Sequence, residues 1–417
     1  MGLLSAQPNE DLASAAPDIH VAWRAAVRLR SGHPWVYRSD LEDDPALPRG
    51  GVVRVLDERQ RVLGWALASS TSQIALRMFS DHDCRDSDVP EIVAARVCAA
   101  IAYREQLGIP QQSNAYRVVF SEADQLPGLI VDRYNEIVAF QILTQAMDRA
   151  EVRETIVGTL EQELNPSGIV ERVEGRIREL EDLPSIPGGL VQGEKSQTTI
   201  AMNATANRPA LRFQYDASAG QKTGAFLDQR DNYAAAEQYA HGSAMDVFCY
   251  QGGFAFHLAR VCSQVTGVDA SRSALEAAER NFELNRSSLR VPEIEWIEGN
   301  AFDLLRDWSD AGRKFGTMVL DPPAFAKTKR ALPTAIRGYK ELNLRALKMI
   351  EHGGVLVTCS CSHHVDQEDF LLMLADAARD AHRRIRLLEL RGQSKDHPVI
   401  AGIPETAYLK CVIAYVE

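Results

Sequence analysis

Residues able to bind a ligand recur in the second half of the chain, where short apolar runs end. One run ends at Asp246 and leads into Gly252-Gly253, and the next ends at Asp269. A third leads to Asn300, and a fourth stops at Asp321 before two prolines. Paired glycines let a backbone approach a ligand closely, and an acid about 20 residues later can accept hydrogen bonds from ribose hydroxyls. These residue types indicate a nucleoside ligand.

The remaining positions narrow the ligand to a methyl donor. The amide of Asn300 can face an adenine edge, and the ring of Phe302 can stack on it. The prolines after Asp321 remove backbone donors and stiffen the loop where a methyl group would react. The glycine pair is not GxGxxG, which counts against dinucleotides and nucleoside triphosphates. Taken in order, the four strand ends predict S-adenosylmethionine.

A cysteine suggests which atom receives the methyl group. Carbon 5 of cytosine is not nucleophilic, but attack of a thiolate on carbon 6 makes it electron-rich, after which a base removes the carbon 5 proton and the thiol leaves. The segment Thr358–Ser362 offers two cysteines. Cys359 lies inside the expected strand and is interpreted as a small buried residue. Cys361 meets the polar turn that follows and is the candidate nucleophile.

Two alternatives stay open at this point. An Asp-Pro-Pro sequence followed by an aromatic residue is also typical of amino methylation, which would make a guanine or adenine nitrogen the acceptor. A non-catalytic RNA-binding assembly factor could retain the same fold. Replacing Cys361 with alanine would separate the enzymatic readings, and a cofactor-binding measurement would test the third.

The elements expected to position these residues alternate between strands and helices. Strands are expected at 244–250, 264–270, 294–299, 317–321 and 354–361, and helices at 252–261, 273–285, 341–351 and 369–381. Such alternation, with apolar strands, predicts a parallel sheet covered on both faces. The closing strands, 385–390 and 408–416, have only a loop between them. They predict a hairpin that places an antiparallel strand at the edge of the sheet.

The first half of the chain has a different pattern. Short alternating strands at 52–57, 62–69 and 74–79 predict a small β-barrel or sheet. The next part of the chain predicts a second, α+β unit. Its helices are expected at 89–107 and 149–164, and its strands at 116–123, 128–143 with a turn at Asn135-Glu136, 168–172 and 189–192.

Bulk properties fit an intracellular protein of several domains. The chain has 417 residues, too many for one compact core. No apolar run approaches the roughly 18 residues of a membrane span, and the N-terminus lacks the basic region of a signal peptide. Seven cysteines without a Cys-x-x-Cys pair argue against a disulfide framework or a metal site. A cytoplasmic location is therefore expected.

Charge is unevenly distributed along the chain. The net charge of −11 counts against non-specific binding to nucleic acid. Two segments nevertheless lack acidic residues, 19–39 and 322–340. Local basic patches on an acidic body favour selective RNA binding, although they can also be ordinary solvated faces. The expected RNA contacts are Arg24, Arg28, Arg30, Lys327, Lys329 and Arg330.

From about Ala26 onward, the sequence resembles the PUA-domain-containing 23S ribosomal RNA cytosine-5 methyltransferases, a class I S-adenosylmethionine-dependent family. The segments that carry the resemblance are 32–36 (GHPWV), 122–134 (EADQLPGLIVDRY), 220–232 (GQKTGAFLDQRDN), 246–254 (DVFCYQGGF), 321–325 (DPPAF), 360–362 (SCS) and 396–398 (DHP).

The resemblance implies an architecture in parts. A flexible tail (1–18) would precede a PUA-like RNA-binding β-barrel (19–88), a central α+β domain (89–210) and a Rossmann-like methyltransferase domain (211–417). The acceptor would be ribosomal RNA, from the large subunit or its precursor, and a homodimer is compatible with the family.

The resemblance also implies roles for individual residues. Cys361 would be the nucleophile, Asp321 would contact the base near ring nitrogen 3, and Phe226–Arg230 would wrap the cofactor. The expected cofactor contacts are Phe226, Asp228, Gln229, Arg230, Asp246, Phe248, Cys249, Tyr250, Gly252, Gly253, Asp269, Ala270, Ser271, Asn300, Ala301, Phe302, Asp321 and Pro322.

The chain departs from the family pattern in a few places. Gln251 replaces the usual threonine and is expected to line the pocket, and Tyr233 stands where arginine is common. Some RNA cytosine methyltransferases have a second cysteine in the Asp-Pro loop, but this loop has none. The group that assists release of Cys361 is therefore unassigned.

Overall fold

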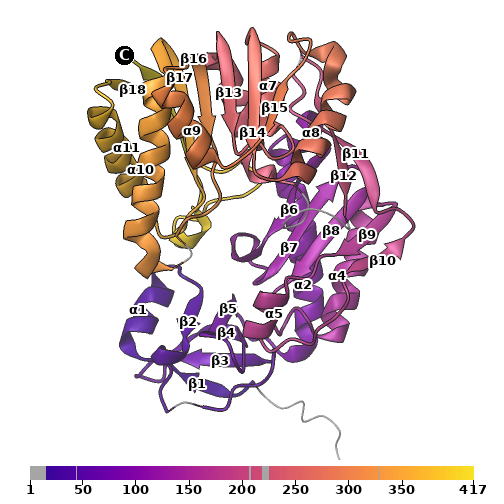
Figure 1. Cartoon of the computed structure of the whole chain (residues 1–417). Coiled ribbons are helices and arrows are strands. Elements are labelled where there is room, and N and C mark those ends of the chain that lie inside the picture. The colour runs from indigo at the N-terminus through magenta and orange to yellow at the C-terminus, as the bar shows by residue number, and fades with distance from the viewer. Residues whose placement is uncertain (1–15, 44, 206–207, 218–224, 327) are drawn as a thin grey trace, which may run out of the picture.

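The computed structural model describes residues 16–43, 45–205, 208–217, 225–326 and 328–417. The expected tail falls largely outside these ranges, as does Lys327. Figure 1 shows an N-terminal β unit in indigo, a central unit in magenta, and a C-terminal unit running from red to yellow.

The N-terminal unit is a twisted five-stranded sheet. Its order is β1 (Asp18–His20), β3 (Val52–Leu56), β4 (Val62–Ala68), β5 (Ile74–Ser80) and β2 (Trp35–Tyr37). The expected strands at 52–57, 62–69 and 74–79 are confirmed. A short helix, α1 (Trp23–Arg30), carries the first basic segment. The sheet buries apolar side chains such as Val36, Val53 and Leu76 in a core of its own.

The central unit packs helices α2 (Val89–Gln106) and α4 (Ala150–Leu164) on a five-stranded sheet. The strand order is β10 (Gly189–Gly193), β9 (Gly168–Glu171), β8 (Ile137–Ile142), β7 (Leu129–Tyr134) and β6 (Ala115–Phe120). Asn135 adopts a positive φ of 57° at the expected turn between β7 and β8. Two short helices were not expected, α3 (Ile109–Gln112) and α5 (Gly175–Leu180).

A separate hairpin joins the central unit to the C-terminal one. Strands β11 (Gln197–Met202) and β12 (Leu211–Asp216) form a two-stranded sheet that the sequence did not predict. Tyr215 of β12 stacks on Tyr134 of β7, with ring centroids 3.7 Å apart. The backbone N–H of Gln214 donates to Asn281 on the following unit. The domain boundaries stay predictions. The hairpin spans the boundary expected between residues 210 and 211, because β11 precedes it and β12 follows it.

The C-terminal unit is a seven-stranded sheet. Its order is β15 (Glu295–Glu298), β14 (Gln264–Asp269), β13 (Ser243–Val247), β16 (Phe315–Leu320), β17 (Ile350–Ser360), β19 (Lys410–Val416) and β18 (Ile385–Arg391). The pairings from β15 to β17 are parallel, whereas β19 is antiparallel to both neighbours. The Rossmann-like fold and the closing hairpin are thus confirmed, but the antiparallel strand β19 lies one position inside the edge, which β18 occupies. The strand order reverses between β13 and β16, which is where ligands bind in such sheets.

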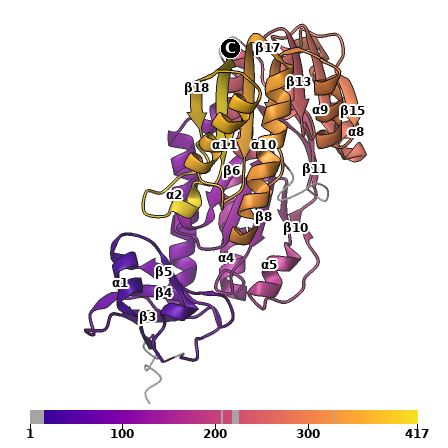
Figure 2. The same cartoon turned by 60° about the vertical axis from the view of Figure 1, so that its left-hand side comes forward.

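Helices cover both faces of this sheet. On one face lie α6 (Arg230–Tyr239), α7 (Gly253–Ala259) and α8 (Arg272–Asn285), and on the other α9 (Ala301–Asp310), α10 (Leu332–Met349) and α11 (Gln367–Asp380). In Figure 2, α10 and α11 lie side by side in front of the sheet.

The helix expected at 341–351 was placed wrongly at both ends. Its structural counterpart, α10, begins at Leu332 and ends at Met349. Pro333 is accommodated in the first turn, where its missing N–H has no partner to lose. Ala335 and Tyr339 of the added turns are buried, so the basic segment lies partly on a core helix. In the described part of the chain, no helix is long and apolar enough to cross a membrane.

Candidate active site

The carboxylate of Asp246 lies at the end of β13 and is buried. Its Oδ2 accepts a hydrogen bond of 2.8 Å from the backbone N–H of Ala255, while Oδ1 has no hydrogen-bond partner among the described residues. Burial raises the pKa of Asp246 well above its ordinary value, and the nearby charge of Asp321 adds to this. An unsatisfied buried carboxylate oxygen requires an explanation, and a ligand cation would supply one.

The loop after β13 holds its conformation against steric preference. Phe248 and Tyr250 have positive φ angles of 67° and 49°, which side chains with a Cβ rarely adopt. Asp269 at the end of β14 stabilises this loop through two hydrogen bonds. Its Oδ2 accepts from the backbone N–H of Tyr250 at 2.9 Å, and its Oδ1 accepts from that of Ser271 at 2.8 Å. Both oxygens of the Asp269 side chain therefore hold this loop in place.

The paired glycines have packing reasons for lacking a side chain. Gly252 has a φ of 91°, and a Cβ there would lie 2.7 Å from the ring of Phe256. A Cβ on Gly253 would lie 2.5 Å from the ring of Tyr233. Close contact with neighbouring rings thus constrains both positions, independently of any ligand.

Asn300 begins α9 as its N-cap. Its Oδ1 accepts a hydrogen bond of 2.9 Å from the backbone N–H of Phe302, and Ala301 is the first helical residue. This use of the oxygen leaves the Nδ2 group as the donor that could face an adenine edge. The ring of Phe302 lies 5.9 Å from that of Phe325 in the Asp-Pro-Pro loop.

Gln229 connects the loop before α6 to the end of β16. Its Nε2 donates a hydrogen bond of 2.8 Å to Oδ1 of Asp321. Its Oε1 accepts one of 2.7 Å from Nδ2 of Asn232, whose own Oδ1 accepts from Arg391 at 2.8 Å. Because both ends of the Gln229 amide are committed, its donor side must face Asp321.

Cys361 follows directly after β17 and is partly exposed. Cys249 and Cys359, which lie near the same edge of the sheet, are buried, and burial raises the pKa of both thiols well above the ordinary value. The expectation that Cys359 is a core residue is confirmed. Beside Cys361, the ring of His363 stacks on Tyr408 with centroids 5.4 Å apart. The hydroxyl of Tyr408 donates to Oδ2 of Asp228 at 2.7 Å.

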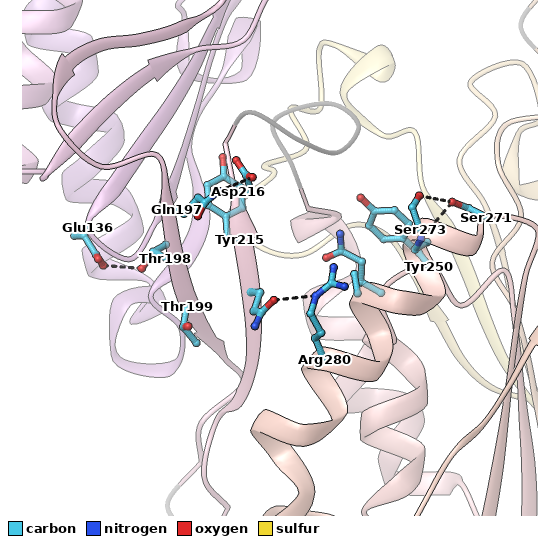
Figure 3. A pocket seen from close by; sticks show the side chains of 14 residues that line it. Glu136, Gln197, Thr198, Thr199, Tyr215, Asp216, Tyr250, Ser271, Ser273 and Arg280 are labelled. Atoms are coloured by element: carbon cyan, nitrogen blue, oxygen red, sulfur yellow. Dashed lines mark hydrogen bonds between the residues drawn. The ribbon is translucent and has the colours of Figure 1, made fainter.

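A polar pocket of about 830 Å³ opens beside the Asp269 loop (Figure 3). Tyr250, Gln251 and Ser271 line one side, as expected for Gln251, and the β11–β12 hairpin lines the other. Arg280 of α8 reaches across to Gln214, with Nε 3.3 Å from Oε1. Tyr250 and Gln251 follow β13 and Ser271 follows β14, so the pocket lies beside the loops after these two strands.

Comparisons with known proteins assign the family. The PUA-like domain family matches residues 19–81, and the S-adenosylmethionine-dependent methyltransferase family matches residues 193–413. Ribosomal RNA large subunit methyltransferase I of Shewanella amazonensis is 36% identical over 387 residues, which is 92% of this chain and 95% of that protein. The protein of the same name from Photobacterium profundum is 34% identical over 395 residues, 93% and 96% of the two chains. The chain belongs to the S-adenosylmethionine-dependent methyltransferases.

The solved structures agree with this fold. A candidate methyltransferase complexed with S-adenosylhomocysteine superimposes with a TM-score of 0.80 at 18% identity, covering 96% of this chain and 100% of that one. At this identity the likeness concerns the fold alone. The methyl donor of this methyltransferase is S-adenosylmethionine, as the strand ends predicted.

The strand-end residues of the methyltransferase fit the donor chemically. S-adenosylmethionine carries an amino group, and the orphaned Oδ1 of Asp246 is an acceptor for a cation. Asp269 and the polar pocket beside it suit the ribose hydroxyls. The individual contacts stay predictions, including those expected for Ala270 and Pro322.

The side chain of Arg230, one of the expected cofactor contacts, pairs with a carboxylate of the same unit. Its guanidinium is buried and pairs with Asp396, with Nη1 2.9 Å from Oδ2 and Nη2 3.1 Å from Oδ1. The backbone N–H of Arg117, in the central unit, donates to the same carboxylate at 2.8 Å. This part of the Phe226–Arg230 loop therefore anchors the methyltransferase fold to the central unit.

The expected RNA contacts in the PUA-like domain are already paired. Arg24 and Arg28 each lie 2.5 Å from a carboxylate oxygen of Asp40, and Arg30 pairs with Asp57. Their net positive charge is correspondingly smaller than the sequence suggested. Lys329 and Arg330 lie exposed in a short turn before α10, and Lys327 lies outside the described residues.

Two residues near Cys361 carried no signal in the sequence. Tyr408 and Lys410 belong to the closing hairpin, which was assigned only an edge role. Their approach to Cys361 results from the antiparallel pairing of β19 with β17, in which Lys410 lies opposite Ser360. Nothing in the local sequence around position 410 indicates this neighbour, because it lies about fifty residues earlier in the chain.

Proposed function

We propose that this methyltransferase transfers a methyl group from S-adenosylmethionine to carbon 5 of a cytosine in large-subunit ribosomal RNA, through a covalent adduct at Cys361. The observation that carries the proposal is the position of Cys361. It follows β17, the parallel neighbour of β16, whose end bears Asp321. It is also the partly exposed cysteine of this edge, and a nucleophile must be reachable.

The proposed acceptor class rests on two further observations. The relatives from Shewanella and Photobacterium are named for ribosomal RNA of the large subunit and match nearly their whole length. The chain also carries a PUA-like domain at its N-terminal end. Exposed Lys329 and Arg330, close to the Asp-Pro-Pro loop, would contact the RNA backbone beside the target base.

In the proposed reaction, two side chains of this protein act on the target base, Cys361 and Asp321. Bound S-adenosylmethionine supplies an electrophilic methyl group. The target cytosine must first leave its stack, at a cost of a few kcal/mol. The thiolate of Cys361 then adds to carbon 6, while Asp321 contacts the base near ring nitrogen 3. Gln229 holds one oxygen of Asp321 in place for this contact.

The test compares 5-methylcytosine in large-subunit RNA methylated by the wild-type protein, Cys361→Ala and Cys98→Ala. Cys98, on α2, is also partly exposed but lies outside the candidate site, so it is the matched control. We expect Cys361→Ala to lose carbon 5 transfer completely and Cys98→Ala to retain it. Methylation that survives Cys361→Ala and maps to a guanine or adenine nitrogen would overturn the proposal in favour of amino transfer.

A further inference from the structure

Lys410 is a buried lysine beside the proposed nucleophile. It is the first residue of β19 and is 8% exposed, which is unusual for a lysine that pairs with no carboxylate among the described residues. Its Nζ donates to the backbone carbonyl of Ser362 at 2.7 Å and to that of Tyr408 at 2.8 Å. Ser360 is its cross-strand neighbour. Lys410 therefore contacts the residues on either side of Cys361.

The two carbonyls determine what the amine can do. A neutral amine has two hydrogens and one lone pair, and here both hydrogens have acceptors. The lone pair then remains to accept a proton. An ammonium group would instead direct its third hydrogen to another acceptor, and a thiolate is one.

The electrostatic surroundings favour exchange of a proton near neutral pH. Burial lowers the pKa of Lys410 to about 8, while Cys361 and Asp366 act in the opposite direction. The phenols of Tyr339 and Tyr408 stay protonated at neutral pH and cannot accept the thiol proton, because burial raises the pKa of Tyr339 and raises that of Tyr408 well above its ordinary value. The turn after Cys361 also carries two histidines, His363, which stacks on Tyr408, and His364.

We propose that Lys410 accepts the thiol proton of Cys361 and holds the nucleophile as a thiolate–ammonium pair. In this step the S–H bond breaks and an N–H bond forms, so the pair carries no net charge before or after the transfer. The thiolate then adds to carbon 6 and is regenerated when a base removes the carbon 5 proton and the bond between carbon 6 and sulfur breaks. Lys410 is a positioning residue, since it acts through Cys361. The inference rests on the proposed role of Cys361.

The experiment measures alkylation of Cys361 by iodoacetamide from pH 6 to 10 in the full-length protein, followed by peptide mass spectrometry. Because only the thiolate reacts, the midpoint of the rate against pH reports the thiol pKa. We expect a wild-type midpoint below the value of about 8.5 for a free thiol. Lys410→Met should raise it by at least one pH unit, which is roughly tenfold slower labelling at pH 7.

Two further variants separate charge from structure. Lys410→Arg retains a cation and should recover part of the lowered midpoint, whereas exposed Lys395→Met should leave it unchanged. S-adenosylhomocysteine affinity, measured by calorimetry, checks that each variant is folded. A wild-type midpoint at or above about 8.5, or a folded Lys410→Met protein with the wild-type midpoint, overturns the inference.

The alkylation experiment and the test of the proposed function can fail separately. Alkylation requires no RNA, so it can fail while Cys361→Ala still abolishes 5-methylcytosine, in which case only the role of Lys410 is wrong. If Cys361→Ala keeps full methylation, the proposed function is wrong whatever the midpoint.

Discussion

Gln229 Nε2 lies 2.8 Å from Asp321 Oδ1, joining the loop before α6 to the end of β16. The glutamine is buried and its carbonyl oxygen is held by Asn232, so the amide cannot turn its oxygen toward the carboxylate. Residues 92 positions apart in the chain are thereby fixed as donor and acceptor. In the proposed reaction, this contact orients the carboxylate that meets the target base.

Replacing Gln229 with alanine removes that donor. We expect methyl transfer to slow by about 10- to 100-fold, because a hydrogen bond to a charged group contributes about 1.5–3 kcal/mol. Steady-state kinetics on RNA will measure the change in kcat, and Gln162→Ala on the exposed face of α4, outside the candidate site, is the control. A Gln229→Ala enzyme with unchanged kcat contradicts the orienting role of Gln229.

Replacing Asp269 with asparagine should weaken cofactor binding. The two carboxylate oxygens accept from the backbone N–H groups of Tyr250 and Ser271, and an amide can replace only one of these acceptors. We expect the Kd for S-adenosylhomocysteine to rise at least about tenfold, given the strength of hydrogen bonds to charged acceptors. Calorimetry measures it, with exposed Asp303→Asn on α9 as the control. Equal affinities would show that the loop does not depend on this charge.

The buried carboxylate of Asp246 should lower the stability of the unliganded protein while it strengthens binding of S-adenosylmethionine. Burial raises the pKa of Asp246 in the folded protein. The free energy of unfolding therefore falls as the pH rises from the ordinary pKa of an aspartate through this raised value. We expect Asp246→Asn to raise Tm at pH 7 by about 2–4 °C per kcal/mol recovered and to weaken binding of S-adenosylmethionine. Thermal melts with and without S-adenosylmethionine measure both effects. A lower Tm in the unliganded variant would contradict this reading of the orphaned oxygen.

The pair between Arg230 and Asp396 should support the junction of two units. Both side chains are buried, and despite burial the Arg230 guanidinium holds the pKa of Asp396 below its ordinary value. The stabilisation is present above the unfolded pKa of Asp396 and is lost as the pH falls toward the folded one. We expect Asp396→Ala to cost about 3–5 kcal/mol, because it leaves Arg230 buried without its partner.

Urea unfolding at pH 7 measures this loss. Asp303→Ala removes an exposed carboxylate that pairs with Arg306 and should change the free energy of unfolding by less than about 1 kcal/mol. If Asp396→Ala is no more destabilising than this control, the buried pair does not stabilise the junction.

Local patterns predicted the residues at the strand ends. Asp246, Asp269 and Asp321 each terminate an apolar run, and a parallel sheet brings such ends to one edge. The same reasoning placed Cys361 beside Asp321. Asn300 was predicted for its amide, and the structure adds that it caps α9.

Partners distant in the chain could not be predicted in this way. Arg230 meets Asp396, 166 residues later, and no periodicity marks that pairing. Arg28 was expected to contact RNA because segment 19–39 lacks acids, yet Asp40 lies one residue beyond that segment and pairs with it. Lys410 meets Ser360 and Ser362, the residues that flank Cys361, only through the antiparallel register of β19.

The most direct test of the central claim is to trap the covalent intermediate. RNA containing 5-fluorocytidine can be attacked and methylated, but its fluorine cannot leave as a proton does, so the enzyme stays attached. With S-adenosylmethionine present, we predict a denaturation-resistant protein–RNA adduct whose cross-linked peptide contains Cys361, and no adduct with Cys361→Ala. An enzyme that methylates its natural RNA but forms no adduct with the fluorinated one, or forms it at another residue, contradicts the account.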